Sequence, residues 1–508
     1  MISGLLLLTA LFLFSLLALR LLLNYFAPGL QSIPGPVLAR FSDLWRFIDA
    51  CKGNHQQTMP ELHSEYGPVV RIGPNFVSVA DPAAVELILG LKANLDKTDS
   101  VNPMINAHEC EYLPMLISAK NSKLHARLKR PIAGAYSMST LLSFENVVND
   151  CSNKLMRRLR EEFVDGKSHG RVCPLHEWLH FFTFDFIGRA TFGKDFGFMD
   201  AGSDINNMIG TLDLQFLYIG TVGSMPWIDR LLLKNPLLLT LIKTPNHLVD
   251  FTAQRIRHRL EGREKGDTSG YDFLSRFLDA QKQHPDVVTD IQLAAYTNAN
   301  ILAASDTTST ALTAIIMCIL QHRDVYDKLQ TEIDANNVSF PVSYTAAQSL
   351  PYLDAVIKET LRFFSTIGID LERTVGASGL VLPTGQSLPP GTIVGMNPWP
   401  LHRDRSVFGD DADKFVPERW LRRETESKAA HDERVRNMQR VFLTFGYGPR
   451  ACLGKHIAYL EIYKLIPTLV GNFDLSLVHP DRPLKTWTGV AVKILDLDVH
   501  IRKRHRGE

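Results

Sequence analysis

The longest run of hydrophobic positions lies near the start of the chain. Residues 5–23 are apolar apart from two hydroxyl residues and Arg20, and a run of about nineteen residues is long enough for one membrane-spanning helix. A cleaved signal peptide is the alternative, but no basic segment precedes the run and no small-residue cleavage site follows it. The nearest positive charges, Arg20 and Arg40, favour a cytoplasmic location for the chain that follows. We therefore expect an uncleaved anchor.

We divide the chain into an anchor at residues 1–25, a hinge at 26–40 and one large domain at 41–508. The hinge contains Ile-Pro-Gly-Pro at positions 33–36, where neither a helix nor a strand can continue. A chain of 508 residues is long enough for two or three domains. However, no internal repeat or low-complexity tract divides it.

Shorter patterns predict individual elements within the large domain. Residues 69–80 are rich in β-branched residues on both sides of Gly-Pro-Asn, which predicts two short strands. Residues 98–120 are polar and interrupted by prolines, which predicts a loop. Residues 291–319 contain no Pro or Gly and follow a Thr-Asp cap, which predicts a long helix. Short runs between glycines and prolines at 375–401 predict a small sheet.

The middle of the long predicted helix has an unusual composition. Residues 303–310 read Ala-Ala-Ser-Asp-Thr-Thr-Ser-Thr, and hydroxyls with a carboxylate inside an apolar helix reduce stability through propensity and desolvation. A structural role is possible, because helical Ser and Thr side chains bond back to the preceding turn. The alternative is that Asp306 and Thr307 perform chemistry.

A second unusual segment lies near the C-terminus. Residues 445–454 read Phe-Gly-Tyr-Gly-Pro-Arg-Ala-Cys-Leu-Gly, so they predict a tight irregular loop before an apolar-periodic helix. Cys452 then lies at a helix N-terminus, where the dipole and free N–H groups favour a thiolate. Arg450 adds a positive charge that suits an anionic cofactor group. This arrangement is how a protein presents a cysteine to haem iron.

Other interpretations of this loop have less support. Gly446-x-Gly448 lacks the preceding strand and the third glycine of a dinucleotide-binding loop. A zinc site lacks ligands, because only His456 is near Cys452 and no second cysteine pair exists. A buried, inert thiol is the default for a lone cysteine.

Composition excludes several classes of function. The chain has 55 Lys and Arg against 54 Asp and Glu, so no basic excess predicts a nucleic-acid partner. The 6 cysteines lack the spacing of a disulfide framework, which agrees with a reducing, cytosolic environment.

Residues 445–454 match, position for position, the haem-binding signature F-x-x-G-x-R-x-C-x-G, so the chain resembles the cytochrome P-450 superfamily. Its five fixed positions are Phe445, Gly448, Arg450, Cys452 and Gly454. The resemblance implies that Cys452 is the axial iron ligand and that Phe445 and Arg450 belong to the cofactor site.

The long helix is similar to a second signature of the superfamily, [A/G]-G-x-[D/E]-T-[T/S], with Ala304 in place of the usual glycine. The resemblance implies that Thr307 hydrogen-bonds the bound oxygen and that Asp306 relays protons from solvent.

A supporting triad is also implied. Glu359 and Arg362 lie three residues apart on one face of a predicted helix, and Arg419 belongs to a Pro-Glu-Arg-Trp segment similar to the family's P-E-R-F. The resemblance implies a buried Glu359–Arg362–Arg419 cluster that holds the cysteine loop.

Further basic residues are assigned to the haem propionates by the same resemblance. His125 and Lys129 occupy the i, i+4 positions of the family's W-x-x-x-R, although both residue types depart from it. Arg373 lies where the family places a propionate-binding arginine. Residues 431–440 read as a charged loop, whose Arg434, Arg436 and Arg440 are candidates for contact with a redox partner.

Over the whole chain, the resemblance implies a mainly helical cytochrome P-450 fold with small sheets and an N-terminal membrane anchor helix. It implies haem b, NADPH electrons delivered by NADPH-cytochrome P-450 reductase (with cytochrome b5 as a possible second donor), O2 and a small apolar substrate. It implies a single-pass protein of the endoplasmic reticulum membrane with the catalytic domain facing the cytosol. Residues 131–138 and 401–404 are similar to the fungal group that includes pisatin demethylase and other enzymes of secondary metabolism.

The expected reaction is hydroxylation, demethylation or desaturation. Two other functions stay open at this point. One is a haem-thiolate isomerase or dehydratase that acts on a peroxide without a reductase, against which the Asp306-Thr307 pair argues. The other is a non-catalytic haem-binding sensor.

Overall fold

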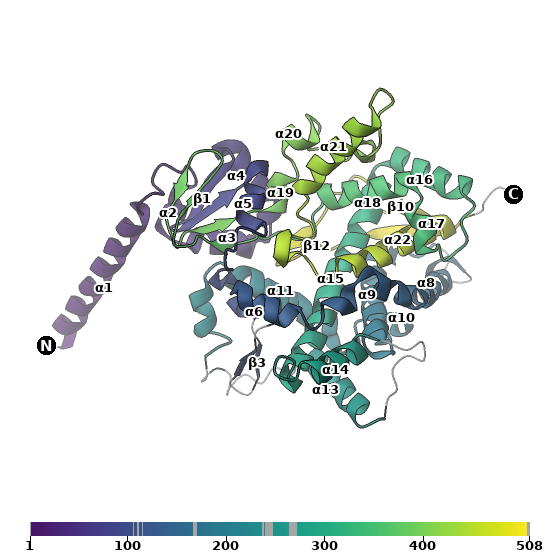
Figure 1. The fold of residues 1–508 in the computed structure, drawn as a ribbon, viewed down its shortest axis with the longest axis horizontal. Helices are drawn as coiled ribbons and strands as arrows, with labels where there is room; N and C mark the ends of the chain where they lie inside the picture. The colour runs from purple at the N-terminus through teal and green to yellow at the C-terminus, as the bar shows by residue number, and fades with distance from the viewer. Residues whose placement is uncertain are drawn as a thin grey trace.

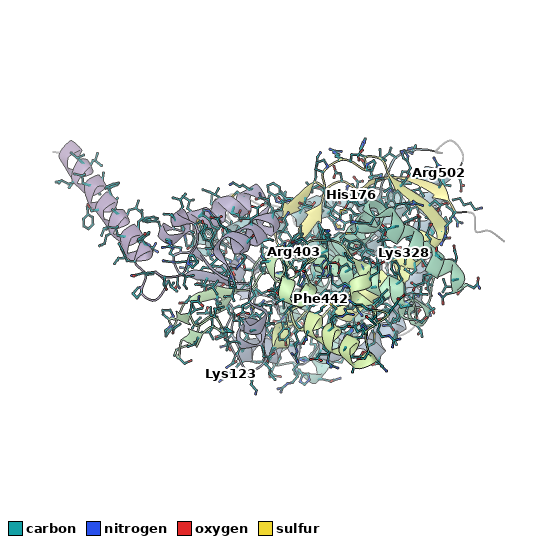
Figure 2. The ribbon with its side chains drawn as sticks, turned by 90° about the horizontal axis from the view of Figure 1, so that it is seen from above. Lys123, His176, Lys328, Arg403, Phe442 and Arg502 are labelled. Carbon is teal, nitrogen blue, oxygen red and sulfur yellow. The ribbon has the colours of Figure 1, made fainter. Side chains whose placement is uncertain are left out.

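Helix α1 (Ile2–Tyr25) stands away from the rest of the protein in the computed structural model (Figure 1). The structure describes residues 2–104, 106–108, 111–113, 115–165, 170–235, 238, 247–263 and 272–504. None of the apolar window within Gly4–Tyr25 is buried, and the side chains of α1 project freely in a second view (Figure 2). Its length and composition make α1 a candidate membrane span.

A four-stranded sheet lies on the side of the molecule next to α1 (Figure 1). Strands β1 (Val69–Gly73) and β2 (Phe76–Val79) pair antiparallel across the Gly-Pro-Asn turn, which confirms the predicted strand pair. Strand β9 (Ile393–Gly395) runs parallel to β2, and β6 (Arg373–Thr374) closes the sheet antiparallel to β9. The sheet therefore brings Arg373 from the second half of the chain next to the first strands.

Within the part of the chain that the structure describes, helices make up most of the remaining structure. Those other than α1 are α2 (Val37–Phe41), α3 (Leu44–Lys52), α4 (His55–Tyr66), α5 (Val85–Leu89), α6 (Ser122–Lys129), α7 (Met138–Leu141), α8 (Glu145–Leu159), α9 (Leu175–Phe192), α10 (Phe198–Ala201), α11 (Met208–Val222), α13 (His247–Leu260), α14 (Phe273–Gln283), α15 (Asp290–Gln321), α16 (Arg323–Ala335), α17 (Tyr344–Gln348), α18 (Pro351–Phe363), α19 (Pro398–Leu401), α20 (Arg405–Phe408), α21 (Lys428–Arg440) and α22 (Lys455–Asn472).

The remaining strands form small separate sheets. Strands β10 (Phe473–Leu477), β13 (Asp498–Lys503) and β5 (Cys173–Pro174) form one sheet, and β11 (Thr486–Thr488) pairs with β12 (Val492–Ile494). Two further hairpins are β3 (Asn106–His108) with β4 (Glu111–Leu113), and β7 (Leu380–Val381) with β8 (Ser387–Leu388). The predicted mainly helical fold with small sheets is confirmed.

Helix α15 is the central helix of the core. The hydroxyl of Thr289 accepts a hydrogen bond from the backbone N–H of Gln292 at 3.2 Å, so the predicted cap is present. The helix packs against α9, α18 and α22. It is long and apolar enough to cross a membrane, but 83% of its apolar window is buried inside the protein. It is therefore a core helix, and its position carries Asp306 and Thr307 into the interior.

Two predicted loops contain regular structure. Within residues 98–120, a 3₁₀ helix (Asp99–Met104) and the β3–β4 hairpin are present. Residues 431–440 belong to α21, which begins where the Ser427 hydroxyl accepts from the N–H of Ala430. This prediction of a loop was wrong because high charge was taken as irregular structure, although α21 contains no Gly or Pro.

Helix α21 also uses one of the arginines proposed for partner contact. Arg434 pairs with Glu426 at 2.7 Å and donates to the carbonyls of Arg419 and Leu421. Its guanidinium therefore holds the preceding segment in place.

Candidate active site

The cysteine loop is held in shape by its backbone. Gly448 has φ +60°, and a Cβ there would lie 2.3 Å from the carbonyl oxygen of Leu89, so only glycine fits this close approach. The N–H of Cys452 donates to the carbonyl of Phe445 at 2.7 Å, which closes the loop. Helix α22 then begins at Lys455. Cys452 is thus held just before the N-terminus of a helix, as the sequence predicts.

The Cys452 side chain has an exposed surface at this loop. Protein atoms on its other sides still desolvate the sulfur and raise the pKa of the thiol, while the backbone N–H groups of Gly454 and Lys455 act in the opposite direction. The expected N–H donors are therefore present, although burial outweighs them in the free thiol. Coordination by a metal ion deprotonates a thiol outright.

The ring of Phe445 lies beside the same helix. Its centroid is 5.0 Å from that of Tyr459, and the ammonium of Lys455 lies 6.0 Å from it. Phe445 therefore connects the start of the loop to the first turns of α22.

Basic side chains from four segments meet beside this loop. They are Lys97, His125, Lys129, Arg373 and Arg450. Burial and the charges of Arg373 and Arg450 lower the pKa of Lys97 to about 7. Burial and the same two arginines, with Lys97 and Lys129, lower the pKa of His125 to about 3. Burial and Arg450 lower the pKa of Arg373 to about 10. The shared positive field shows that these groups are neighbours.

The hydrogen bonds of this cluster go to carbonyl oxygens. Arg450 donates to Ala119 and Lys120 at 2.5 and 2.7 Å, Lys97 to Ile117 at 2.6 Å, and Lys129 to Pro449 at 3.2 Å. Within the described residues, none of the five basic groups has a carboxylate within 4.0 Å. Buried positive charge without a counter-charge is unfavourable. The cluster is therefore suited to an anionic group such as the two propionates of haem.

Lys97 belongs to this cluster, although the sequence analysis did not identify it. It follows no recognisable motif and is distant in sequence from the other members. The structure brings His125, Lys129, Arg373 and Arg450 together as the sequence proposes, with His125 buried and Lys129 bonded to the loop itself.

A row of small residues on α15 faces an apolar region. Ala295, Ala299, Ala303 and Thr307 are spaced four residues apart, so they lie along one side of the helix. Ala303 is exposed and Thr307 is half-buried, and the Thr307 hydroxyl donates to the carbonyl of Ala303 at 2.6 Å. The back-bonding expected of a helical threonine is therefore present, and the hydroxyl oxygen can still accept.

Apolar side chains from distant segments surround this row. Ala295 belongs to a buried cluster, with Phe216, Ala299 and Ile369 packed against it; the other members are Val101, Met104, Met115, Ile219 and Val490. These residues come from the 98–120 segment, α11 and the turn after β11. Such a lining suits an apolar ligand.

Asp306 is 2% exposed and lies near two basic side chains that do not hydrogen-bond to its Oδ1. Its Oδ1 is 3.7 Å from Nε2 of His180 and 3.8 Å from Nζ of Lys493. Among the residues that the structure describes, this oxygen has no hydrogen-bond partner. Burial raises the pKa of Asp306 to about 6, against the opposing charge of Lys493. A carboxyl group with this pKa can take up and release a proton near neutral pH.

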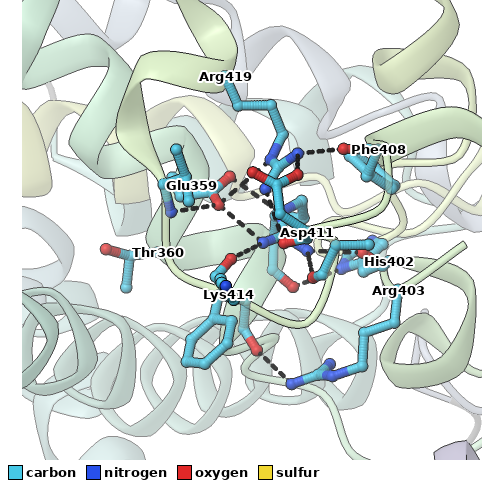
Figure 3. A network of polar contacts seen from close by, with 12 residues as sticks. Glu359, Thr360, His402, Arg403, Phe408, Asp411, Lys414 and Arg419 are labelled. Atoms are coloured by element: carbon cyan, nitrogen blue, oxygen red, sulfur yellow. Dashed lines mark hydrogen bonds and ion pairs between the residues drawn. The ribbon is translucent and has the colours of Figure 1, made fainter. Parts of the chain in front are cut away.

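The supporting triad is a fully buried ion cluster (Figure 3). Arg362 pairs with Glu359 at 2.7 and 2.9 Å through two nitrogens, and Nε of Arg419 lies 3.4 Å from the same carboxylate. Glu359 also accepts from the backbone N–H of Val416 and from the indole of Trp420, both at 2.9 Å. Every oxygen of this buried carboxylate is therefore bonded.

The triad is connected to the cysteine loop through His402 and Thr444. His402 Nδ1 lies 3.1 Å from the carbonyl of Arg362, and its Nε2 accepts from the N–H of Leu443 at 2.8 Å. The hydroxyl of Thr444 donates to the carbonyl of Leu361 at 2.7 Å. These bonds attach the two residues before Phe445 to α18. The sequence analysis gave His402 no role, because its partners are far from it in the chain.

The sequence model of the cytochrome P-450 family matches residues 34–499. The chain is 36% identical over 492 residues to cytochrome P-450 monooxygenase vrtE of Penicillium aethiopicum, covering 94% of this chain and 89% of that protein. It is 37% identical over 459 residues to cytochrome P-450 monooxygenase cicH of Emericella nidulans, covering 89% and 90%. It is 33% identical over 488 residues to cytochrome P-450 monooxygenase cfoH of Aspergillus candidus, covering 95% and 90%.

The family match spans the last part of the hinge, the central helix and the cysteine loop. Members of the family hold haem through a cysteine thiolate, and the residues around Cys452 fit that cofactor by their N–H donors and their unbalanced positive charge. The chain belongs to the cytochrome P-450 family and is a haem-thiolate monooxygenase of that family.

Proposed function

We propose that this protein oxidises a small apolar molecule of fungal secondary metabolism, using O2 and NADPH electrons supplied by a reductase. The observation that carries the proposal is the placement of Cys452 beside basic groups that lack carboxylate partners within the described residues. The fungal relatives, each a cytochrome P-450 monooxygenase, support the assignment to such a pathway.

The residues around Cys452 have distinct proposed roles. The Cys452 thiolate would hold the haem iron, and Phe445 packs beside the loop that presents it. The propionates are held by the charges and hydrogen bonds of Arg450, Arg373, Lys129 and Lys97, and by a hydrogen bond from the neutral imidazole of His125. When bound, haem supplies the activation of O2. The protein excludes water, orients the substrate and supplies protons.

Asp306 and Thr307 are the proposed proton-handling pair. The Thr307 hydroxyl lies at one end of the row of small residues on α15, where it donates to the carbonyl of Ala303 and can accept a further bond. Asp306 has a pKa of about 6 because it is buried, so its carboxyl group holds a proton in a useful fraction of molecules near neutral pH. The apolar side chains around Ala295 keep bulk water away from the reacting atoms.

The anchor supports a location at the endoplasmic reticulum membrane. No residue in the apolar window of α1 is buried by the rest of the protein, which suits a lipid environment. We propose a single span with the catalytic domain on the cytosolic side, where NADPH-cytochrome P-450 reductase, and cytochrome b5 as a second donor, reach the cysteine side of the protein.

Metabolite profiling by mass spectrometry tests the proposed function. The wild type, Cys452→Ala and the matched control Cys51→Ala, whose thiol is also exposed, are expressed beside a reductase in microsomes with NADPH and fungal small-molecule extract. We expect a product with the wild type and the control and none with Cys452→Ala. Its mass distinguishes hydroxylation, demethylation and desaturation.

The same assay separates the other functions. Products formed from hydroperoxides without NADPH would instead indicate an isomerase or dehydratase. A haem-loaded wild type that turns over neither kind of substrate would contradict an enzymatic role.

A further inference from the structure

Asp306 on α15 faces charged and titratable groups from three other elements. His180 comes from α9, with His176 of the same helix next to it; Asp213 comes from α11, and Lys493 comes from β12. Burial and the charge of Lys493 hold the pKa of His180 well below its usual value, so its imidazole is neutral. Lys493 is therefore the cation that acts on Asp306 at close range.

Lys493 contacts two carboxylates unequally. Its ammonium forms an ion pair and a hydrogen bond with Oδ1 of Asp213, while it remains 3.8 Å from Oδ1 of Asp306. The Asp213 side chain is 40% exposed and that of Asp306 is 2% exposed. An ammonium group is normally attracted most strongly to the carboxylate in the less polar surroundings. Here the exposed carboxylate holds it instead.

Helix α11 carries Asp213 and also covers the apolar region beside α15. Phe216 and Ile219 belong to or pack on the cluster around Ala295. Two glycines bring α11 close to the β11–β12 turn: a Cβ on Gly489 would lie 2.8 Å from the carbonyl of Phe216, and one on Gly220 would lie 2.7 Å from the backbone of Gly489. The position of α11 over the apolar region therefore sets the position of Asp213 relative to Lys493.

We propose that Lys493 is a positioning residue for proton delivery, and that Asp213 on α11 holds its ammonium outside hydrogen-bond distance of Asp306 while α11 covers the pocket. The inference rests on the proposed function, in which Asp306 supplies protons. When α11 is in place, the proton affinity of Asp306 stays raised. When α11 moves away, Lys493 is released and can pair with Asp306, whose proton affinity then falls. The proton affinity of Asp306 thereby depends on whether α11 covers the substrate pocket.

The electrostatics of the two arrangements differ in a measurable way. Burial raises the pKa of Asp306 to about 6; Lys493 lowers it, and the charge of Asp213 acts in the same direction as burial. Moving the same ammonium from 3.8 Å into direct contact strengthens the attraction and lowers the pKa further. Loss of the ammonium has the opposite effect. The proton affinity of Asp306 therefore reports where Lys493 lies.

Infrared spectroscopy of the full-length, haem-loaded protein measures this proton affinity directly. The carbonyl band of the protonated Asp306 carboxyl is assigned with isotope-labelled aspartate and by its loss in Asp306→Asn, then titrated from about pH 4 to about pH 9. We expect Asp213→Asn to move the midpoint down, and Lys493→Met to move it up, each by about one pH unit. Lys493→Arg should stay near the wild type, because it keeps the charge.

The double variant decides whether Asp213 acts through Lys493. We expect Asp213→Asn to have little effect in the Lys493→Met background. Lys485→Met is the matched control, since Lys485 lies just before the same hairpin and is more exposed, and it should leave the midpoint unchanged. An equal downward shift in both backgrounds would mean that Asp213 acts by its charge alone and would overturn the proposal. So would an unchanged midpoint in Lys493→Met.

This measurement needs no substrate turnover. If the midpoints follow the expected pattern and no product is found by profiling, the proposed function fails while the coupling stands. If profiling succeeds and the midpoints do not move as expected, the coupling fails alone.

Discussion

Two buried carboxylates, Glu359 and Asp306, have opposite surroundings. Glu359 is 0% exposed and accepts hydrogen bonds from two arginines, an indole and a backbone N–H. Asp306 is 2% exposed, and among the described residues its Oδ1 accepts no hydrogen bond. Both lie in the interior of one protein, so burial alone does not decide their roles. Complete pairing holds a charge in one state, whereas incomplete pairing leaves the proton affinity near neutral pH.

The largest effect should come from breaking the satisfied cluster. Glu359→Ala leaves Arg362 and Arg419 buried without their carboxylate, which costs on the order of 3–5 kcal/mol of folding free energy. We expect little haem-loaded protein, measured by the ratio of haem absorbance to protein. Glu418→Ala is the control, because Glu418 is exposed and pairs with Lys328. Normal haem content in Glu359→Ala would refute the role assigned to the triad.

Removing the unsatisfied carboxylate should spare the fold and impair the chemistry. Asp306→Asn keeps the size of the side chain but cannot transfer a proton, so we expect product formation to fall by about 100-fold. The comparison is with Asp324→Asn, an exposed position. A product yield in Asp306→Asn equal to that of the control would show that protons reach the site by another path.

Stability should change with pH in a defined direction at Asp306. Its pKa is raised from 3.8 to about 6, so the folded protein binds the proton more tightly than the unfolded chain. Stability is therefore lost as pH rises from about 4 to about 6. As pH rises through that interval, Asp306→Asn should gain stability relative to the wild type, as measured by thermal unfolding at several pH values. A gain of the variant relative to the wild type as the pH falls would contradict the assignment.

The smallest effect should come from the connection between the triad and the loop. His402→Leu leaves the N–H of Leu443 without its acceptor, which costs about 1–3 kcal/mol. Burial lowers the pKa of His402 to about 3, so the wild type loses stability as pH falls below about 6.5. The variant has no imidazole at this position and lacks this pH-dependent loss. Thermal unfolding at pH 5 and pH 8 measures both effects. A loss of haem as severe as in Glu359→Ala would assign His402 to the cluster itself.

Much of the fold could be predicted where the signal was local. The strands at Val69–Gly73 and Phe76–Val79 follow from β-branched residues around one turn, and α15 follows from a cap and an uninterrupted helical run. Helix α21 could not be recognised by its charge, because a solvent-facing helix and a polar loop have similar compositions. Its cap at Ser427 was the signal that would have identified it.

The candidate site likewise contains residues that a local motif identifies and residues that only distant partners identify. Cys452, Asp306 and the Glu359–Arg362 pair lie in short motifs, where a few neighbouring positions define the chemistry. Lys97, His402 and Lys493 have no such motif. Each acquires its role from partners that lie tens or hundreds of residues away, and a single sequence does not record these distances.

The sequence by itself determined the class of protein. The cysteine loop, the Asp306-Thr307 pair and the Glu359–Arg362 pair must each keep fixed local spacings to perform their chemistry. The tertiary structure decided how each charge behaves. It placed five basic groups together without a carboxylate partner in the described chain, paired Glu359 completely and left Oδ1 of Asp306 near Lys493 without a hydrogen bond. The reason is that proton affinity and pairing depend on distances and burial, and these exist only after distant segments have packed.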